Sequence, residues 1–421
     1  MAKNIHFIGI GGIGNSSLAQ ILHEKGFNIS GSDLSPSDIT KSLKLKGITI
    51  NYEHKAANIN KRHNKIIYSP AIPENNTELL EAKKLKIPCL TYPQALGEFS
   101  KDYYTIAISG THGKSTTTAM TAKIFIDAGL DPTVVIGTKM RELKNKNYRK
   151  GDSKYLIIEA CEYKKSFLNF TPNILVITNI EADHLDYYKT LANYRKAFEE
   201  MVSKVPKNGK IIIPGDGKIK KLIKSAKAEI VTAKSKIKPG IPGDFNISNA
   251  SLATEVALSQ NIPISRIEKS LKNYKGSWRR LQYKRKKLGK TLFIDDYAHH
   301  PTEIKMTLTA IREDHPHAKL LCIFQPHQYS RTKTLLKEFG KAFIDADKVI
   351  IPNIYKVRDS EEDMKKVSTD VLVNEINKYD NKAQNGNGLK ETANYIKTRH
   401  KNFDLIVTMG AGDIGKIYKM F

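Results

Sequence analysis

Residues 104–116, YTIAISGTHGKST, decide the fold of this 421-residue chain more than any other stretch. They predict a buried strand, a compact glycine loop and the start of a helix, an arrangement in which backbone N–H groups cradle the phosphates of a nucleoside triphosphate. In this pattern Lys114 reaches the β- and γ-phosphates, and the Ser115 hydroxyl binds Mg²⁺. The predicted loop consists of Gly110, Thr111, His112, Gly113, Lys114, Ser115 and Thr116.

Polar side chains follow two further strand-like runs of the same region. Glu159 ends the run YLIIE, Asn179 ends the run NILVITN, and Asp183 and His184 follow it. Parallel strands end at one edge of their sheet, where the phosphate loop also lies, so we expect these groups to converge on the γ-phosphate and its metal. Oxygen ligands suit Mg²⁺, and an imidazole is a less usual ligand for it.

Alternation of strand-like and helix-like segments runs through the whole chain and predicts an α/β fold with mostly parallel sheets. The length predicts more than one core, and we take three domains as the working number. The expected boundaries are 1–100 for the first unit, 101–276 for the unit with the phosphate loop, and 277–421 for the last.

A second glycine loop, GIGGIG at 9–14, lies between a predicted strand and a predicted helix near the N-terminus. Asp33 follows it at the end of the next strand, which completes the fingerprint of a dinucleotide-binding unit. Such glycines let the backbone approach a pyrophosphate, and the acid meets a ribose hydroxyl. The fingerprint fits NAD and a UDP-sugar equally well, so an NAD(P)-dependent dehydrogenase remains an alternative on this segment alone.

Composition and charge narrow the class of protein. The formal net charge is +26, but the excess is mostly lysine and is spread along the chain, which favours a solvated surface over a nucleic-acid site. A basic nucleic-acid-binding ATPase is the alternative. No apolar run is long enough to span a bilayer, and no secretory signal begins the sequence, so we expect a cytoplasmic protein. Cys89, Cys161 and Cys322 show neither disulfide nor zinc spacing.

Several further motifs occur in one order: SGSD (30–33), YSPAIPENN (68–76), EACEYKKSFL (159–168), TNIEADHLDYY (178–188), SWRRLQ (277–282), DDYAHHPTEI (295–304), FQPHQYSRT (324–332) and GAGDIG (410–415). With the two glycine loops, they make the chain resemble the Mur ligase family over its whole length. The resemblance implies a Rossmann-like N-terminal UDP-substrate domain, a central P-loop ATPase and a Rossmann-like C-terminal domain. It also implies a ligase of peptidoglycan synthesis that uses ATP and Mg²⁺.

Within the family the motifs are most similar to the members that join L-alanine to the lactyl carboxylate of UDP-N-acetylmuramic acid. The resemblance implies a reaction through an acyl phosphate, with release of ADP and phosphate. We also expect a monomer or weak homodimer that binds no nucleic acid. The alternative within the family is a ligase that recycles a whole tripeptide onto the same sugar.

The resemblance also assigns residues by matching motif. It implies that the UDP-substrate is held by Gly11, Gly12, Ile13, Gly14, Ser32, Asp33, Ser69 and Ile72. ATP would also meet Asn246, Asn249, Arg280 and Asp296. One Mg²⁺ would be held by Ser115, and Glu159 and His184 would hold a second metal position. Catalysis would depend on Lys114, Glu159, Asn179, His184, His299 and Arg331, and the amino acid would contact Tyr297, His327 and Arg331. His299 or His327 would take the amine proton.

Two positions depart from the family pattern. Phe245 stands where a histidine usually precedes the first asparagine of the adenine-binding element, so this position keeps a planar ring for adenine but offers it no polar group. Gln328 stands where an arginine is usual, which leaves Arg331 as the main candidate for the amino acid's carboxylate. The second departure leaves the choice among alanine, glycine and serine open.

Overall fold

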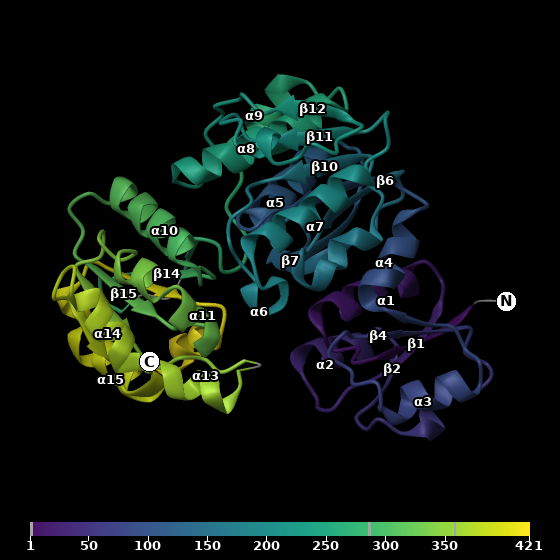
Figure 1. Cartoon of the computed structure of the whole chain (residues 1–421), viewed down its shortest axis with the longest axis horizontal. Helices are drawn as coiled ribbons and strands as arrows, with labels where there is room; N and C mark the ends of the chain where they lie inside the picture. The colour runs from purple at the N-terminus through teal and green to yellow at the C-terminus, as the bar shows by residue number, and fades with distance from the viewer. Residues whose placement is uncertain (1–2, 285–287, 358) are drawn as a thin grey trace. The chain divides into compact units, whose positions relative to one another are not determined.

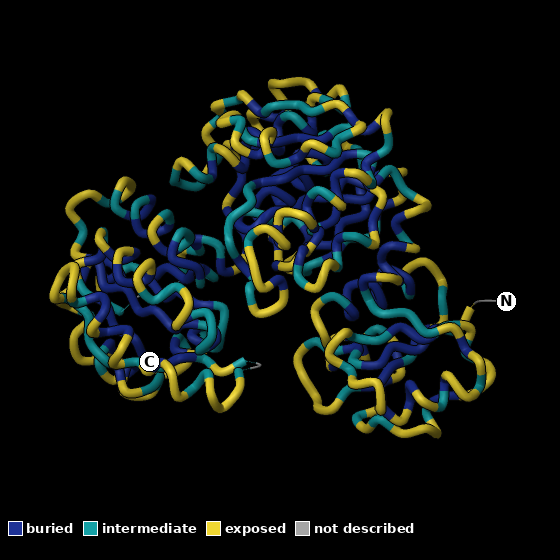
Figure 2. Tube along the Cα trace, in the orientation of Figure 1, coloured by how far each residue is buried: buried dark blue, intermediate teal, exposed yellow. Residues whose placement is uncertain are grey.

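The computed structural model describes residues 3–284, 288–357 and 359–421 (Figure 1). The chain divides into two compact units, Met1–Ile237 with Asn249–Leu271 and Lys238–Ser248 with Lys272–Phe421. The described residues form three sheets, two in the first unit and one in the second. Buried residues follow the strands of each sheet (Figure 2). The predicted α/β class with mostly parallel sheets is confirmed.

The N-terminal sheet is parallel, with strand order β3-β2-β1-β4-β5, which is typical of a doubly wound nucleotide-binding fold. Its strands are β1 (Asn4–Ile8), β2 (Asn28–Ser32), β3 (Thr49–Asn51), β4 (Lys65–Tyr68) and β5 (Cys89–Thr91). Its helices are α1 (Ile13–Glu24), α2 (Asp38–Lys44), α3 (Thr77–Lys84) and α4 (Tyr92–Ser100). The order reverses beside β1, so the glycine loop after β1 lies at the switch point where such sheets bind ligands.

The central sheet has the order β12-β11-β10-β6-β9-β7-β8, and only β8 runs antiparallel to its neighbour. Its strands are β6 (Tyr104–Ser109), β7 (Thr133–Met140), β8 (Lys146–Arg149), β9 (Tyr155–Glu159), β10 (Ile174–Ile177), β11 (Lys210–Ile213) and β12 (Glu229–Thr232). Its helices are α5 (Lys114–Asp127), α6 (Leu185–Tyr188), α7 (Leu191–Ser203), α8 (Asp244–Leu258) and α9 (Ile264–Lys272). The strand β6 is flanked by β9 and β10, so their carboxyl ends meet at the phosphate loop.

The C-terminal sheet has the order β13-β14-β18-β15-β16-β17 and is parallel apart from β13. Its strands are β13 (Gln282–Tyr283), β14 (Leu292–Asp296), β15 (Leu320–Phe324), β16 (Lys348–Ile351), β17 (Ala383–Asn385) and β18 (Leu405–Met409). Its helices are α10 (Pro301–Asp314), α11 (Tyr329–Thr334), α12 (Leu336–Gly340), α13 (Glu361–Lys366), α14 (Thr369–Asn377) and α15 (Gly388–Arg399). Apolar side chains cover both faces of this sheet, as its near-continuous apolar strands require.

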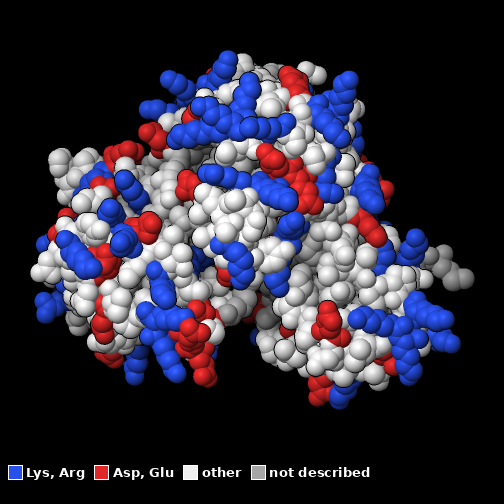
Figure 3. All heavy atoms as spheres, in the orientation of Figure 1, with Lys and Arg blue, Asp and Glu red and all other residues white. Residues whose placement is uncertain are grey.

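Figure 3 shows lysine and arginine side chains in several separate groups on the face in view, with acidic side chains among them and uncharged areas between them. Within the described residues, no helix combines the length and the apolar character that crossing a membrane requires.

Candidate active site

The phosphate loop joins β6 to α5 and depends on two glycines with left-handed backbone. Gly110 has φ 133° and Gly113 has φ 79°, backbone conformations that residues with a side chain rarely adopt. A Cβ atom at Gly110 would collide with the Thr178 hydroxyl, and one at Gly113 would lie 2.5 Å from Asn249 Oδ1. Both glycines are therefore fixed by backbone conformation and by close packing.

Asn179, at the end of the β10 region, holds the loop in shape. Its carbonyl accepts from the Thr111 amide at 3.1 Å, its Oδ1 accepts from the His112 amide at 2.9 Å, and its Nδ2 donates to the His112 carbonyl at 3.0 Å. The Thr178 hydroxyl donates to the same carbonyl. The amide of Asn179 thus organises the loop, and its expected contact with the γ-phosphate stays a prediction.

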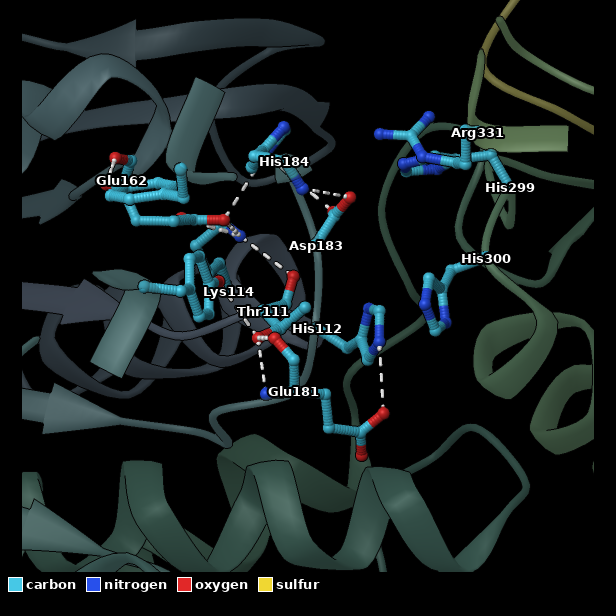
Figure 4. Close-up of polar contacts among 12 residues, drawn as sticks. Thr111, His112, Lys114, Glu162, Glu181, Asp183, His184, His299, His300 and Arg331 are labelled. Carbon is cyan, nitrogen blue, oxygen red and sulfur yellow. Dashed lines mark hydrogen bonds and ion pairs between the residues drawn. The ribbon is translucent and has the colours of Figure 1, made fainter. Parts of the chain in front are cut away.

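Lys114 and His184 meet at a residue that the sequence reasoning did not single out, Glu162. Its carboxylate lies 3.1 Å from Lys114 Nζ, and its Oε1 lies 3.5 Å from His184 Nε2 (Figure 4). Burial raises the pKa of a carboxyl, but Lys114 and His184 outweigh it, and the pKa of Glu162 lies below its ordinary value. Burial lowers the pKa of Lys114, but Glu162 raises it above its ordinary value. The pair is therefore an ammonium and a carboxylate.

Glu159 has different partners from His184. The Ser115 hydroxyl donates to Glu159 Oε1 at 3.1 Å, and the Gly137 amide of β7 donates to Oε2 at 2.8 Å. A hydroxyl and a carboxylate in contact at the start of α5 are hard oxygen donors of the kind that Mg²⁺ prefers, so these residues fit that ion. His184, the third predicted ligand, lies 3.5 Å from Glu162 and 3.7 Å from Asp183.

His184 precedes α6 in a left-handed conformation, with φ 53°. Its amide donates to Asp183 Oδ1 at 2.7 Å, and its ring packs on Tyr163 with the centroids 4.8 Å apart. A non-glycine residue rarely adopts this backbone, and such residues persist where the surrounding contacts fix them. The contacts to Asp183 and Tyr163 supply that fixation.

The N-terminal glycine loop is closed by Asp33, whose Oδ2 accepts from the Gly11 amide at 2.8 Å. Gly12 is the N-cap of α1, so the first amides of that helix follow it directly. Ser69 and Ile72 flank the loop, since a Cβ atom at Gly9 would lie 3.2 Å from Ser69 Cβ and 3.5 Å from Ile72 Cδ1. The predicted diphosphate-binding residues are thus brought together.

Ser32 and Ile13 show other contacts in this domain. Ser32 is fully buried, and its hydroxyl donates to Glu78 Oε2 at 2.5 Å, so its side chain serves the interior. Ile13 is 49% exposed, and its carbonyl accepts from Asn147 of β8 at 3.2 Å. That contact ties the start of α1 to the central sheet within the first unit.

The two predicted adenine contacts lie three residues apart in α8. Asn246 donates to the Pro242 carbonyl at 2.6 Å, and Asn249 Oδ1 accepts from the Thr117 hydroxyl of α5 at 3.1 Å. Asn249 therefore packs directly on the phosphate loop and its helix. Phe245, which replaces the usual histidine, packs on the apolar core of the C-terminal sheet.

The predicted amino-acid residues form one cluster within the second unit. The rings of His299 and His327 have centroids 6.2 Å apart, and Tyr297 lies 5.6 Å from His299. Arg331 Nη1 is 3.3 Å from the His327 carbonyl and 3.5 Å from its Nδ1. Glu303, which sequence reasoning missed, has its Oε2 3.2 Å from His299 Nδ1 and accepts from the His299 amide at 3.0 Å.

Arg280 and Asp296 border this cluster. The Arg280 guanidinium lies 5.0 Å from the centre of the Tyr297 ring. Asp296 accepts from the amides of Leu281 (2.5 Å) and Ala298 (2.7 Å), so both carboxylate oxygens organise backbone. Burial raises the pKa of Asp296 to about 6, although Arg280 and the two amides lower it. The expected contacts of Arg280 and Asp296 with ATP stay predictions.

Gln328 has a structural task of its own. It is 5% exposed, its backbone has φ 77°, and its Nε2 donates to the Val357 carbonyl at 3.2 Å. An arginine at this position would have to give up that bond and keep the left-handed backbone. Gln328 thus stabilises the backbone before α11 through its own side chain.

Comparisons with known proteins match the chain domain by domain. Residues 4–104 match the Mur ligase family catalytic domain, residues 108–237 the Mur ligase middle domain, and residues 279–412 the Mur ligase glutamate ligase domain. The UDP-N-acetylmuramate–L-alanine ligase of Clostridium kluyveri is 39% identical, with 100% of this chain and 98% of the relative covered. The ligase of the same name from Clostridium botulinum is 41% identical, with 100% and 97% covered.

Solved structures agree with this assignment. The UDP-N-acetylmuramate–alanine ligase of Thermotoga maritima superposes with a TM-score of 0.79 at 26% identity and covers 99% of this chain and 98% of its own. A murein peptide ligase from Psychrobacter arcticus has a TM-score of 0.71 at 22% identity, with 99% and 98% covered, and shows the same fold. With all three domain models and full-length relatives matched, the chain belongs to the Mur ligase family.

Proposed function

We propose that the chain is an ATP-dependent ligase that joins L-alanine to the lactyl carboxylate of UDP-N-acetylmuramic acid in peptidoglycan precursor synthesis. The observation that carries the proposal is the carboxyl edge of the central sheet, where the glycine phosphate loop ends in Lys114 and Ser115 and the Ser115 hydroxyl donates to Glu159. The full-length relatives named for this activity support the choice of substrates.

The reaction that fits these residues begins with phosphoryl transfer. A carboxylate oxygen attacks the γ-phosphorus of ATP, the bond to the β-phosphate oxygen breaks, and ADP leaves. The amine of L-alanine then attacks the acyl phosphate, phosphate leaves with the bonding pair, and the amine gives up a proton. Lys114 and Arg280 would offset negative charge on the transferring group, so the protein contributes positioning and electrostatics.

Ser115 would hold one Mg²⁺ ion, and Glu159, which accepts from the Ser115 hydroxyl at 3.1 Å, would hold a second with His184. When bound, the ions supply positive charge next to the phosphate oxygens. The loop amides and Lys114 orient the phosphates, and Asn179 fixes the loop. Loss of Glu159 or His184 is therefore expected to change the Mg²⁺ requirement at the second position.

The C-terminal cluster would bind the amino acid. Arg331 would pair with the carboxylate of L-alanine, and His327 and Tyr297 would line the same place. His299 is our choice for the base, because a proton on Nδ1 would be shared with the Tyr297 carbonyl at 3.1 Å and with Glu303, which leaves Nε2 as the basic nitrogen.

The competing functions have less support. The dehydrogenase accounts for the N-terminal loop alone and leaves the phosphate loop without a task. The basic nucleic-acid-binding ATPase leaves the N-terminal loop unexplained. The tripeptide-recycling ligase shares the fold, but the relatives at 39% and 41% identity are named for L-alanine. We also propose the domain limits 1–100, 101–276 and 277–421. The protein would be a monomer or weak homodimer. It would work in the cytoplasm, where ATP and nucleotide sugars are found.

Nucleotide-dependent phosphate release tests the proposal. It should require ATP, UDP-N-acetylmuramic acid and L-alanine together, and NAD or DNA should not replace either co-substrate. Release that depends on DNA would contradict the ligase. Faster release with the tripeptide than with L-alanine would favour recycling.

Replacing Glu159 or His184 by alanine should raise the Mg²⁺ concentration for half-maximal activity, by about 10- to 100-fold if a ligand or its orientation is lost. The measurement is a Mg²⁺ titration of initial rates at saturating ATP. Asp186→Ala is the matched control, because this exposed carboxylate lies two residues from His184. An unchanged Mg²⁺ dependence in both site variants would remove the metal role.

The two loop glycines Gly12 and Gly14 should respond differently to a side chain. A Cβ at Gly12 meets only the Gly9 carbonyl at 3.5 Å, whereas one at Gly14 lies 2.6 Å from the Tyr92 ring. Gly12→Val should therefore keep the melting temperature and ATP binding. It should weaken UDP-N-acetylmuramic acid binding, because a side chain would keep the diphosphate away from the backbone. Gly14→Val should lower the melting temperature, since overpacking costs about 1–3 kcal/mol. Calorimetry and thermal melts check both, and tight NAD binding by the parent would favour the dehydrogenase.

A further inference from the structure

The ammonium of Lys114 already has a full set of acceptors within the protein. Its three N–H donors face the carbonyls of Gly110 (2.5 Å) and Thr111 (2.9 Å) and the carboxylate of Glu162 (3.1 Å). A lysine ammonium has three donors and no more. Any bond from Lys114 to a nucleotide phosphate must therefore replace one of these three.

Glu162 is the acceptor whose replacement has the largest electrostatic effect, because it alone is charged. Its side chain is fully buried, and its carbonyl is held by the Tyr188 hydroxyl at 2.5 Å and the Lys165 amide at 2.9 Å. The carboxylate is thus fixed between Lys114 on one side and His184 on the other (Figure 4). A phosphate that approaches Lys114 also approaches this fixed negative charge.

We propose that Glu162 is a positioning residue that holds Lys114 against the loop and competes with the nucleotide phosphate for it, an inference that rests on the proposed ATP site. On binding, the ammonium exchanges the carboxylate for a phosphate oxygen, and Glu162 keeps His184 as its neighbour. Lys114 then has a counter-charge before and after the exchange, as a buried ammonium requires. Because Glu162 weakens the binding of ATP in the ground state, more of the attraction of Lys114 is expressed in the transition state of phosphoryl transfer.

Glu162→Gln tests this, since it removes the charge and nearly keeps the shape. Without divalent cations, in EDTA, the variant should bind ATP about five- to tenfold more tightly than the parent, because a repelling charge is removed. AMP, which lacks the β- and γ-phosphates, should bind equally to both. With Mg²⁺, kcat should fall about tenfold or more, because Lys114 and His184 lose the group that orients them.

The alternatives give different results. A purely structural role predicts weaker binding of ATP and AMP alike, and a role only as a metal ligand predicts unchanged ATP binding in EDTA. Either result overturns the inference. If the parent itself fails to bind ATP, the proposed function fails, whereas a parent that binds ATP without tightening in the variant contradicts only the role of Glu162. Glu200→Gln, at a half-exposed ion pair with Lys165, is the matched control.

A second measurement does not depend on nucleotide. Thermal melts of Lys114→Met, Glu162→Gln and the double variant form a cycle. Lys114→Met should lower the melting temperature most, because it leaves a buried carboxylate unpaired, and adding Glu162→Gln should recover part of the loss. Strictly additive shifts would show that the two side chains do not stabilise each other and would overturn the inference.

Discussion

Replacing Lys114 by alanine should lower ligation by about 10²- to 10³-fold or more, since the variant loses the point charge beside the transferring phosphoryl group. Binding of UDP-N-acetylmuramic acid should stay close to that of the parent, because the N-terminal glycine loop has its own contacts. Phosphate release and calorimetry with the nucleotide sugar are the two measurements.

Stability must be separated from chemistry in this variant, because Lys114→Ala leaves Glu162 buried and unpaired. The double variant with Glu162→Gln should regain melting temperature and remain inactive. Lys123→Ala is the matched control on the same helix, where a mostly buried lysine pairs with Asp127 at 2.9 Å. It should lose stability and keep turnover. Near-parental phosphate release by Lys114→Ala would refute the assignment of the phosphate loop.

Replacing Arg331 by alanine should raise the KM for L-alanine about 10- to 100-fold or more, because each charge-assisted bond to a carboxylate contributes about 1.5–3 kcal/mol. The KM for ATP should change little. Initial rates over a range of L-alanine concentrations provide the measurement. Lys333→Ala, an exposed cation two residues further along α11, is the control. If Arg331→Ala couples L-alanine as well as the parent does, the carboxylate is recognised elsewhere.

Gln328, three residues before Arg331, does not share its expected role. An arginine is usual at this position in the family pattern. The buried amide of Gln328 instead donates to the Val357 carbonyl and starts α11 from a left-handed backbone. Arg331 therefore carries the prediction by itself, and the preference among alanine, glycine and serine has to be measured.

Local patterns explain why much of the fold was predictable. A run of apolar residues, a glycine loop and a helix are adjacent in sequence at 104–116, and the same holds at 4–14. The carboxyl ends of β6, β9 and β10 then meet because parallel strands place them on one edge. Glu159 and Asn179 could be predicted near the phosphate loop for this reason, and both contact residues of the loop and the helix start.

The residues that sequence reasoning missed depend on tertiary contacts. Glu162 lies beyond the end of β9 in an irregular segment, and its partner Lys114 is 48 positions away. The second glutamate of EACEY was the available signal, but nothing in its spacing predicts complete burial. Glu303 is the third residue of α10 and caps the helix by accepting from the His300 amide, and only the structure shows it beside the His299 ring. The local sequence pattern also did not predict that β8 runs antiparallel to β7.

In the proposed reaction ATP phosphorylates the muramyl carboxylate, and L-alanine then displaces the phosphate. The most direct measurement starts from UDP-N-acetylmuramic acid with ¹⁸O in both carboxylate oxygens, mixed with enzyme, ATP, Mg²⁺ and L-alanine, and reads the products by mass spectrometry. A reaction through the acyl phosphate predicts one ¹⁸O in the released phosphate and one in the new amide of the L-alanine product. Phosphate without ¹⁸O, or ATP hydrolysis without an amide product, would contradict it.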